Sequence, residues 1–295
     1  YLEYANTTGK LADLWLMLGD NAYNNGLDSE YNSGLFNIYP EILKNTVLWP
    51  TLGNHDGYAK NYVSGEIPYY ASFSLPRNGE AGGVPSGTES YYSFDYANIH
   101  FISLNSYDEN RDNAATMATW LKNDLQSSNR KWKIAYWHHP PYSKGSHDSD
   151  REIELIEMRE NILPILEDYG VDLVLTGHSH SYERSFLVDG HYGLSNSLTN
   201  SMIIDGNTNT YLKPPQNVGH YGAVYVVNGT AALATSGELN HPVMYTSQHK
   251  LASMVLDIDA LNIKATTIDS EGKILDSFII SKKITNSFTN SQKVL

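Results

Sequence analysis

The sequence VDLVLTGHSHSYER, residues 171–184, joins a short apolar run to two histidines that are one residue apart. The run lacks the alternation of a half-exposed strand, which predicts a strand buried on both faces. Loops that follow parallel strands carry the ligands of α/β sheets. Because side chains two residues apart in an extended loop point the same way, His178 and His180 can address two neighbouring ions.

Three more polar motifs follow apolar runs in the same manner. They are Gly19-Asp20-Asn21-Ala22-Tyr23 after Leu14–Leu18, Gly53-Asn54-His55-Asp56 after Val47–Leu52, and His138-His139 after Lys133–Trp137. Carboxylate, amide, phenol and imidazole groups all bind hard or borderline metal ions. Since the carboxyl ends of parallel strands meet at one edge, we expect all four motifs at one rim of one sheet. The pattern predicts a metal-dependent hydrolase with two ions.

Individual residues in these motifs suggest individual roles. Asp20 has two carboxylate oxygens and can bridge cations that lie about 3.5–4 Å apart. Asn54 offers a neutral oxygen ligand, and His55 is expected to face the substrate as a proton donor or phosphate partner. Either His138 or His139 could bind an ion, and His138 is the preferred ligand. Each motif alone has a plainer interpretation, as a turn, a cap or a structural histidine; the order of all four favours the metal site.

The segments between the motifs predict alternating strands and helices, which is typical of a layered α/β domain. The expected helices lie near Ser29–Leu43, which Pro40 interrupts, at Asn113–Leu125 and at Ile153–Tyr169. The runs Tyr91–Tyr96 and Ile99–Leu104 predict a hairpin. We expect a second, mostly antiparallel sheet from four later strands: Ala223–Asn228, Ser253–Asp257, Asn262–Thr267 and Lys273–Ile280.

Composition narrows the class of protein. The 295 residues carry a formal net charge of −13, which argues against nucleic acid as a partner. There is no cysteine, so thiolate zinc sites and disulfides are excluded. No run approaches the roughly 20 apolar residues of a membrane-spanning helix. We expect one domain over residues 1–282 and a disordered tail over 283–295.

Two of the motifs are more specific than the rest. Tyr23 gives the pattern Gly-Asp-x-x-Tyr, and residues 177–184 give Gly-His-x-His-x-Tyr-Glu-Arg. With these residues the chain resembles the calcineurin-like metallophosphoesterases, and among them the purple acid phosphatases most. The hairpin over Tyr91–Asn105 is also similar to one in that family. The resemblance implies an α/β fold in which two mixed sheets form a layered β-sandwich flanked by helices.

The resemblance also implies a ligand for each ion. Asp20 would bridge a ferric ion and a divalent ion, which in the family is iron, zinc or manganese. Tyr23 and His180 would bind the ferric ion, while Asn54, His138 and His178 would bind the divalent ion. His55 would lie beside the phosphoryl group, and His147 occupies the loop where the family often has a further catalytic histidine.

The chain departs from the family pattern at two places. The family has an Asp-x-Gly motif upstream of Gly-Asp-x-x-Tyr, and its Asp is a ferric ligand; none of the 19 residues before Asp20 forms that motif. We therefore expect an N-terminally truncated sequence that lacks one strand and one ligand, and a chain that is a poor catalyst. Asp56 stands where purple acid phosphatases usually have Glu.

The predicted reaction is hydrolysis of phosphate monoesters by a metal-bound hydroxide, with a small phosphorylated substrate as the partner. One alternative is a phosphodiesterase or nucleotide-cleaving enzyme with the same metals. Another is a metal-binding or phosphate-binding protein that has lost catalysis, and a plainer one is an α/β domain with structural histidines. The resemblance implies a secreted or periplasmic protein, with no membrane partner.

Overall fold

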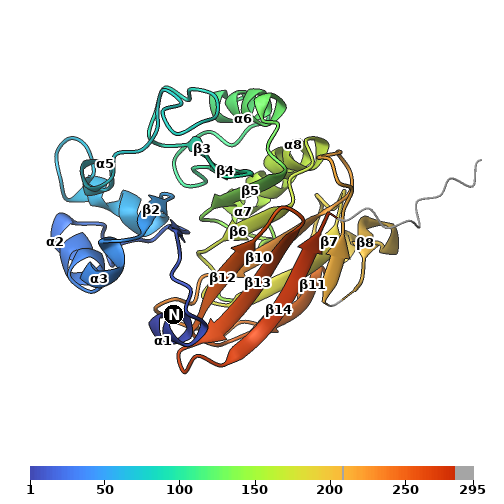
Figure 1. Ribbon diagram of the computed structural model, residues 1–295. Helices are drawn as coiled ribbons and strands as arrows, with labels where there is room; N and C mark the ends of the chain where they lie inside the picture. The colour runs from blue at the N-terminus through green and yellow to red at the C-terminus, as the bar shows by residue number, and fades with distance from the viewer. Residues whose placement is uncertain (208, 283–295) are drawn as a thin grey trace, which may run out of the picture.

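The computed structural model describes residues 1–207 and 209–282, and its strands form three sheets (Figure 1). The predicted tail at 283–295 lies outside the described residues. The largest sheet has eight strands in the order β11-β7-β10-β6-β5-β4-β3, with β8 paired to β7. Its strands are β3 (Tyr92–Tyr96), β4 (Ile99–Ser103), β5 (Trp132–Trp137), β6 (Leu173–Thr176), β7 (Tyr182–Val188), β8 (Ile203–Asp205), β10 (Ala223–Asn228) and β11 (Met244–Gln248).

The second sheet has four strands in the order β12-β13-β14-β9 and lies against the large sheet (Figure 1). Its strands are β9 (Thr210–Leu212), β12 (Ala252–Ile258), β13 (Asn262–Asp269) and β14 (Ile274–Ser281). Both sheets are mixed, because β4, β5, β6 and β10 run parallel in the first and β9 runs parallel to β14 in the second. The expected layered α/β fold with two mixed sheets is confirmed.

The third sheet contains only β1 (Leu14–Met17) and β2 (Val47–Pro50), paired in parallel. The expectation of four motifs on one sheet is therefore wrong: two motifs follow this small sheet and two follow the large one. Strand β10 was also expected in the second sheet, but it pairs with β6 and β7. Its residues Ala223–Val227 are all buried, as in a strand covered on both faces.

Helices and helical turns flank the sheets. The α-helices are α1 (Leu2–Thr8), α2 (Asp28–Tyr31), α3 (Pro40–Leu43), α4 (Asn54–Gly57), α5 (Pro68–Ser72), α6 (Thr116–Ser127), α7 (Ile153–Glu157) and α8 (Leu163–Asp168). The other helical turns are η1 (Asn32–Phe36), η2 (Tyr58–Asn61), η3 (Met158–Ile162), η4 (Ser195–Ser197) and η5 (Asn200–Met202). Pro40 begins α3 and separates it from η1, as expected. No helix in the two described ranges combines the length and apolar character needed to cross a membrane.

The two faces of the large sheet pack against different layers. On β5, Ile134 belongs to the cluster shared with the second sheet, and the adjacent Ala135 belongs to the cluster shared with α6 and α8. This alternation follows from the two-residue period of a strand. The helix predicted at Asn113–Leu125 is present as α6, and it buries Met117, Trp120, Leu121 and Leu125.

A buried ion pair ties the two large layers together. The Arg184 guanidinium on β7 donates from Nε to Asp276 Oδ2 on β14 over 2.6 Å, and Tyr182 Oη donates to the same oxygen over 2.7 Å. The Tyr and Arg of the motif at residues 177–184 thus join the sheets, directly after the histidines at the large sheet's carboxyl edge.

Candidate metal centre

Glycines let the four motif loops approach one another closely. A Cβ atom on Gly19 would lie 2.4 Å from Nδ1 of His138, and one on Gly53 would lie 2.1 Å from the backbone nitrogen of Asp20. Gly19 also has φ +86°, a conformation that side chains disfavour. Only glycine permits these contacts, so Gly19 lets the small sheet approach the large one, and Gly53 lets the two loops of the small sheet approach each other.

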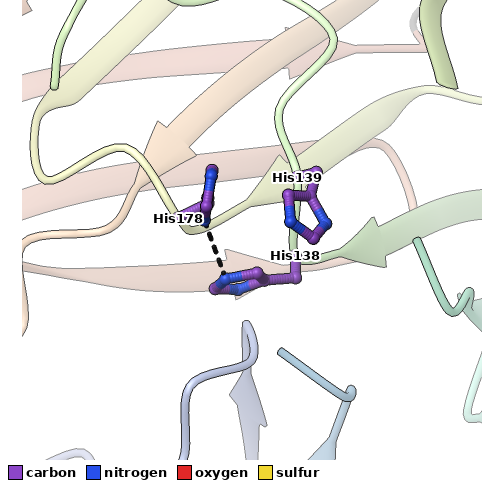
Figure 2. Close-up of side chains that lie close together, drawn as sticks. All are labelled: His138, His139 and His178. Atoms are coloured by element: carbon purple, nitrogen blue, oxygen red, sulfur yellow. Dashed lines mark hydrogen bonds between the residues drawn. The ribbon is translucent and has the colours of Figure 1, made fainter. Parts of the chain in front are cut away.

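Four side-chain atoms from four motifs form one donor group. Asn54 Oδ1 lies 3.0 Å from His138 Nε2 and 3.1 Å from His178 Nδ1. The two histidine nitrogens are 3.2 Å apart, as the dashed line in Figure 2 shows, and Asp20 Oδ2 lies 3.3 Å from His138 Nε2. An ion bound tetrahedrally at about 2.0 Å from each donor separates the donors by about 3.3 Å. The spacing therefore fits one cation.

A second group begins at the same carboxylate oxygen. Tyr23 Oη lies 2.9 Å from Asp20 Oδ2 and 3.4 Å from His180 Nε2. Asp20 Oδ2 thus belongs to both groups, which is the position of a bridging ligand. The structure brings together all six side chains predicted as ligands; we call these the donor cluster: Asp20, Tyr23, Asn54, His138, His178 and His180.

Hydrogen bonding around His138 gives a chemical test of whether a cation fits. His138 Nδ1 lies 2.8 Å from the carbonyl oxygen of Leu18, which can only accept, so Nδ1 carries the proton. In the neutral ring Nε2 then presents a lone pair to Asp20 Oδ2 and Asn54 Oδ1, which are also acceptors. Three lone pairs face one point, so the residues present fit a bound cation.

Burial and the attraction between Asp20 and His138 both shift pKa values in the donor cluster. Burial alone would raise the pKa of Asp20 and lower that of His138, but attraction between the two reverses both shifts, so Asp20 is lowered and His138 raised. Burial and the Asp20 charge together raise the pKa of Tyr23. Burial lowers the pKa of His178 to about 4 and also lowers that of His180, which favours the neutral imidazole that binds metal, and a nearby cation would favour the phenolate form of Tyr23.

Two donor-cluster residues have left-handed backbones although they are not glycine. Asp20 has φ +54° and His178 has φ +62°. Such conformations are uncommon for residues with a side chain and concentrate at functional sites. Their presence at two ligand positions agrees with a functional constraint on these loops.

The adjacent residue His139 has different contacts from His138. Its Nδ1 lies 2.9 Å from Ser106 Oγ, and burial lowers its pKa far below the usual range. Its ring centroid is 4.3 Å from that of His178, so His138, His139 and His178 lie close enough for a shared ion. His138 contacts Asp20 and Asn54, which is the arrangement expected for the preferred ligand.

His55 lies at the exposed edge of the donor cluster. Its backbone N–H donates to Asp20 Oδ1 over 2.9 Å, and its Nδ1 donates to the carbonyl of Asn24 over 2.6 Å. The second bond leaves Nε2 of the ring for a substrate or a proton. The next residue, Asp56, is fully buried and accepts from Gly53 N over 2.9 Å, so it fixes the turn that carries Asn54 and His55.

His147 lies beside the donor cluster through His178. The two ring centroids are 3.7 Å apart. The sequence analysis did not identify Glu152, whose Oε2 lies 2.8 Å from His147 Nδ1 and 3.5 Å from His178 Nε2. Its only sequence signal is a glutamate at the start of a predicted helix, which usually indicates a favourable charge at a helix end.

A second missed residue supports the loop that carries His178 and His180. Glu183 is fully buried, and its Oε1 accepts from Ser143 Oγ over 2.6 Å and from Ser181 Oγ over 2.8 Å. These bonds fix the loop from behind. Glu183 therefore supports the loop without being a ligand itself, and its position in the sequence alone gives no sign of this role.

Comparison with known proteins points to one family. Residues 3–182 match the family model described as calcineurin-like phosphoesterase. Purple acid phosphatase 15 of Arabidopsis thaliana is 32% identical over 198 residues, which cover 59% of this chain and 36% of that protein. Purple acid phosphatase 18 of the same plant is 31% identical over 176 residues, covering 58% and 38%. The chain spans less than two fifths of the length of these relatives.

A solved structure is similar in fold over nearly the whole chain. Purple acid phosphatase PPD1 from yellow lupin seeds gives a TM-score of 0.70 at 20% identity, covering 95% of this chain and 48% of that one. At this identity the likeness concerns the fold alone. The matched family region contains β1, β2, β5 and β6 and therefore every strand that precedes a donor motif.

Proposed function

Because this chain belongs to the calcineurin-like phosphoesterase family, we propose that it hydrolyses phosphate monoesters at a binuclear metal centre held by the donor cluster. The observation that carries the proposal is that Asp20 Oδ2 is shared by two donor groups. Asn54, His138 and His178 hold the divalent ion, and Tyr23 and His180 hold the ferric ion. The divalent ion is iron, zinc or manganese.

The chemistry divides between the ions and the chain. When bound, the two cations supply positive charge for the phosphoryl oxygens and activate a water molecule. His55 lies next to Asp20 at the exposed edge, and its bond to Asn24 fixes the ring with the Nδ1 proton toward that carbonyl, so that Nε2 can take up a proton from solvent and pass it to the leaving oxygen. His147 is the second histidine at this edge, and we assign it to phosphate binding or proton transfer.

The decisive experiment combines metal binding with turnover. Purified protein is loaded with iron and zinc, bound metal is counted, and hydrolysis of 4-nitrophenyl phosphate and bis(4-nitrophenyl) phosphate is measured. The proposal expects two ions per chain and a higher kcat/KM for the monoester. A preference for the diester would instead favour a phosphodiesterase, and two tightly bound ions without turnover would favour a binding protein.

The resemblance to purple acid phosphatases provides the reason to expect a ferric ion beside Tyr23. Phenolate bound to ferric iron gives a visible charge-transfer band, so Tyr23→Phe should remove the colour of iron-loaded protein. A band that persists in this variant would exclude Tyr23 as the ligand. The secreted or periplasmic location also remains a proposal, which fractionation of the native organism tests.

A further inference from the structure

Glu152 occupies the position before helix α7 (Ile153–Glu157) but does not cap it. Its carboxylate turns instead toward the donor cluster. Oε2 lies 2.8 Å from Nδ1 of His147 and 3.5 Å from Nε2 of His178, and Oε1 accepts from the backbone N–H of Asp148 over 3.0 Å. One carboxylate therefore contacts a predicted metal ligand and a predicted catalytic histidine, with a backbone bond holding it in place.

The two ring nitrogens of His178 face different groups. Nδ1 lies 3.1 Å from Asn54 Oδ1 and 3.2 Å from His138 Nε2, on the side where a cation fits. Nε2 faces Glu152 on the opposite side. An imidazole that offers a lone pair from Nδ1 must carry its proton on Nε2, and an Nε2–H group requires an acceptor such as a carboxylate.

We propose that Glu152 is a positioning residue, which fixes the ring of His178 with Nδ1 toward the divalent ion and aligns His147 beside it. This inference rests on the proposed function, because it concerns the same centre. Carboxylates that accept from a ligating histidine fix the ring tautomer and increase ligand basicity. The need for such a partner is greater here because His178 sits on a loop with a left-handed backbone and not on a regular strand.

Stacking extends the effect of Glu152 to the second histidine. The rings of His147 and His178 lie 3.7 Å apart at an interplanar angle of 33°. Because His147 donates from Nδ1 to the same carboxylate, its Nε2 remains available for a proton or a phosphate oxygen. Rotation of Glu152 away from this position would release both rings together.

A different role for Glu152 would be ligation of a third ion. His147, Glu152 and His178 lie close enough to hold one. His178 would then have to bind metal through both nitrogens and lose its remaining proton. The geometry favours a hydrogen bond, because Nε2 with its proton satisfies the carboxylate without that loss. The number of bound ions separates the two roles.

The test measures zinc affinity by titration calorimetry in the iron-loaded full chain, for the wild type and four variants, the fourth being His178→Ala. Glu152→Ala should weaken zinc binding by about 10–100-fold, the range found when such a partner of a ligand is removed. Glu152→Gln keeps an oxygen acceptor and should recover most of that affinity. Glu160→Gln, an exposed neighbour on η3, is the matched control and should bind zinc as the wild type does. Nitrogen-15 spectra should show the proton of His178 on Nε2 in the wild type and in Glu152→Gln. This preference for Nε2 should be lost in Glu152→Ala.

Three results would count against the inference. Wild-type zinc affinity in Glu152→Ala, together with weakened affinity in His178→Ala, would overturn the role of Glu152 and leave the proposed function intact. Three ions in the wild type and two in Glu152→Ala would make Glu152 a ligand. No zinc binding by the wild type would overturn the proposed function and this inference with it.

Discussion

Buried carboxylates lie near both ends of strands β5 and β6, but the groups that surround them differ. At the amino end, Asp172 lies 2.7 Å from the Lys282 ammonium and 3.0 Å from the Lys213 ammonium, and all three side chains are buried; we call them the lysine clasp. At the carboxyl end, Asp20 lies in the donor cluster among acceptors and histidines. The clasp has its cations covalently attached, whereas the cations proposed for the donor cluster would come from solution.

This difference explains why the lysine clasp stabilises the fold, whereas the donor cluster can serve as a reactive site. The lysines of the clasp are also bound to main-chain oxygens: Lys213 Nζ donates to Val171 and Gly222, and Lys282 Nζ to Lys131. No position is left for a substrate. At the donor cluster an exchangeable ion can leave open positions, which is a property of catalytic sites. The predictions below test this contrast.

The largest expected effect is on stability, at the lysine clasp. Asp172→Asn would leave two buried ammonium groups without their carboxylate, and removing one partner of a buried ion pair costs about 3–5 kcal/mol. Urea unfolding of metal-free protein measures the loss. A loss below about 1 kcal/mol would mean that the main-chain oxygens and Asn217 Oδ1 satisfy the lysines without the carboxylate.

The next effect is on catalysis, at the donor cluster. His178→Ala and Asn54→Ala should each reduce kcat for 4-nitrophenyl phosphate by at least about 100-fold. Each substitution removes one proposed ligand of the divalent ion, whose positive charge stabilises the transition state. Circular dichroism should show an unchanged fold. Near-normal turnover in either folded variant would place the reaction elsewhere.

A smaller effect links metal to stability. Zinc at ten times its dissociation constant should raise the free energy of unfolding by about 1.4 kcal/mol, because it binds the folded chain. The gain should vanish in His178→Ala and persist in Lys44→Ala, an exposed control at the end of α3. Equal stabilisation of both variants would show that zinc binds outside the donor cluster.

The smallest effect concerns a third buried group of charges, in which the cation is a histidine, His100, that loses its charge when it is deprotonated. His100 lies 2.8 Å from both Asp95 and Asp124. Burial alone would lower its pKa, but the bonds and charges of the two carboxylates outweigh burial and raise it. A raised folded-state pKa gives stability that is complete below the ordinary value of about 6.5 and is lost as the pH rises through the folded-state pKa.

Unfolding at a series of pH values from 5.5 to 8.5 measures this effect. The free energy of unfolding should fall over the upper part of the range in the wild type, and the fall should be smaller in His100→Gln. An identical pH dependence in the two proteins would assign the change to other groups. The metal-free protein is used, so that ligand protonation does not contribute.

Much of the fold could be predicted from the sequence, because strong local signals decided it. The buried strands at β5 and β6, the amphipathic α6 and the break at Pro40 all agree with the structure. The prediction failed where partners, not local pattern, decide the sheet. Strand β10 is locally similar to the strands of the second sheet, and β7 begins in the polar residues Tyr182-Glu183-Arg184, which hide its strand character.

The same division applies to the candidate site. The six donor-cluster residues could be predicted because each follows a strand end, even though those strands belong to two sheets. The roles of Glu152 and Glu183 could not be predicted, because they depend on His178 and Ser143, which are distant in sequence and which only the folded loops bring near them. The spacing of Glu152 from the histidines has no fixed pattern, whereas Glu183 belongs to the motif at residues 177–184 and only its supporting role was not predicted. The roles of the cluster as ligands stay predictions that the experiments above address.

The central claim is that the donor cluster holds paired cations through a shared carboxylate. Anomalous diffraction from crystals loaded with zinc and iron tests it most directly. The account predicts one ion within about 2.0–2.3 Å of His138 Nε2, His178 Nδ1 and Asn54 Oδ1, and a second beside Tyr23 and His180, with Asp20 between them. Ions bound elsewhere, or a single ion that leaves Asp20 uncoordinated, would contradict it.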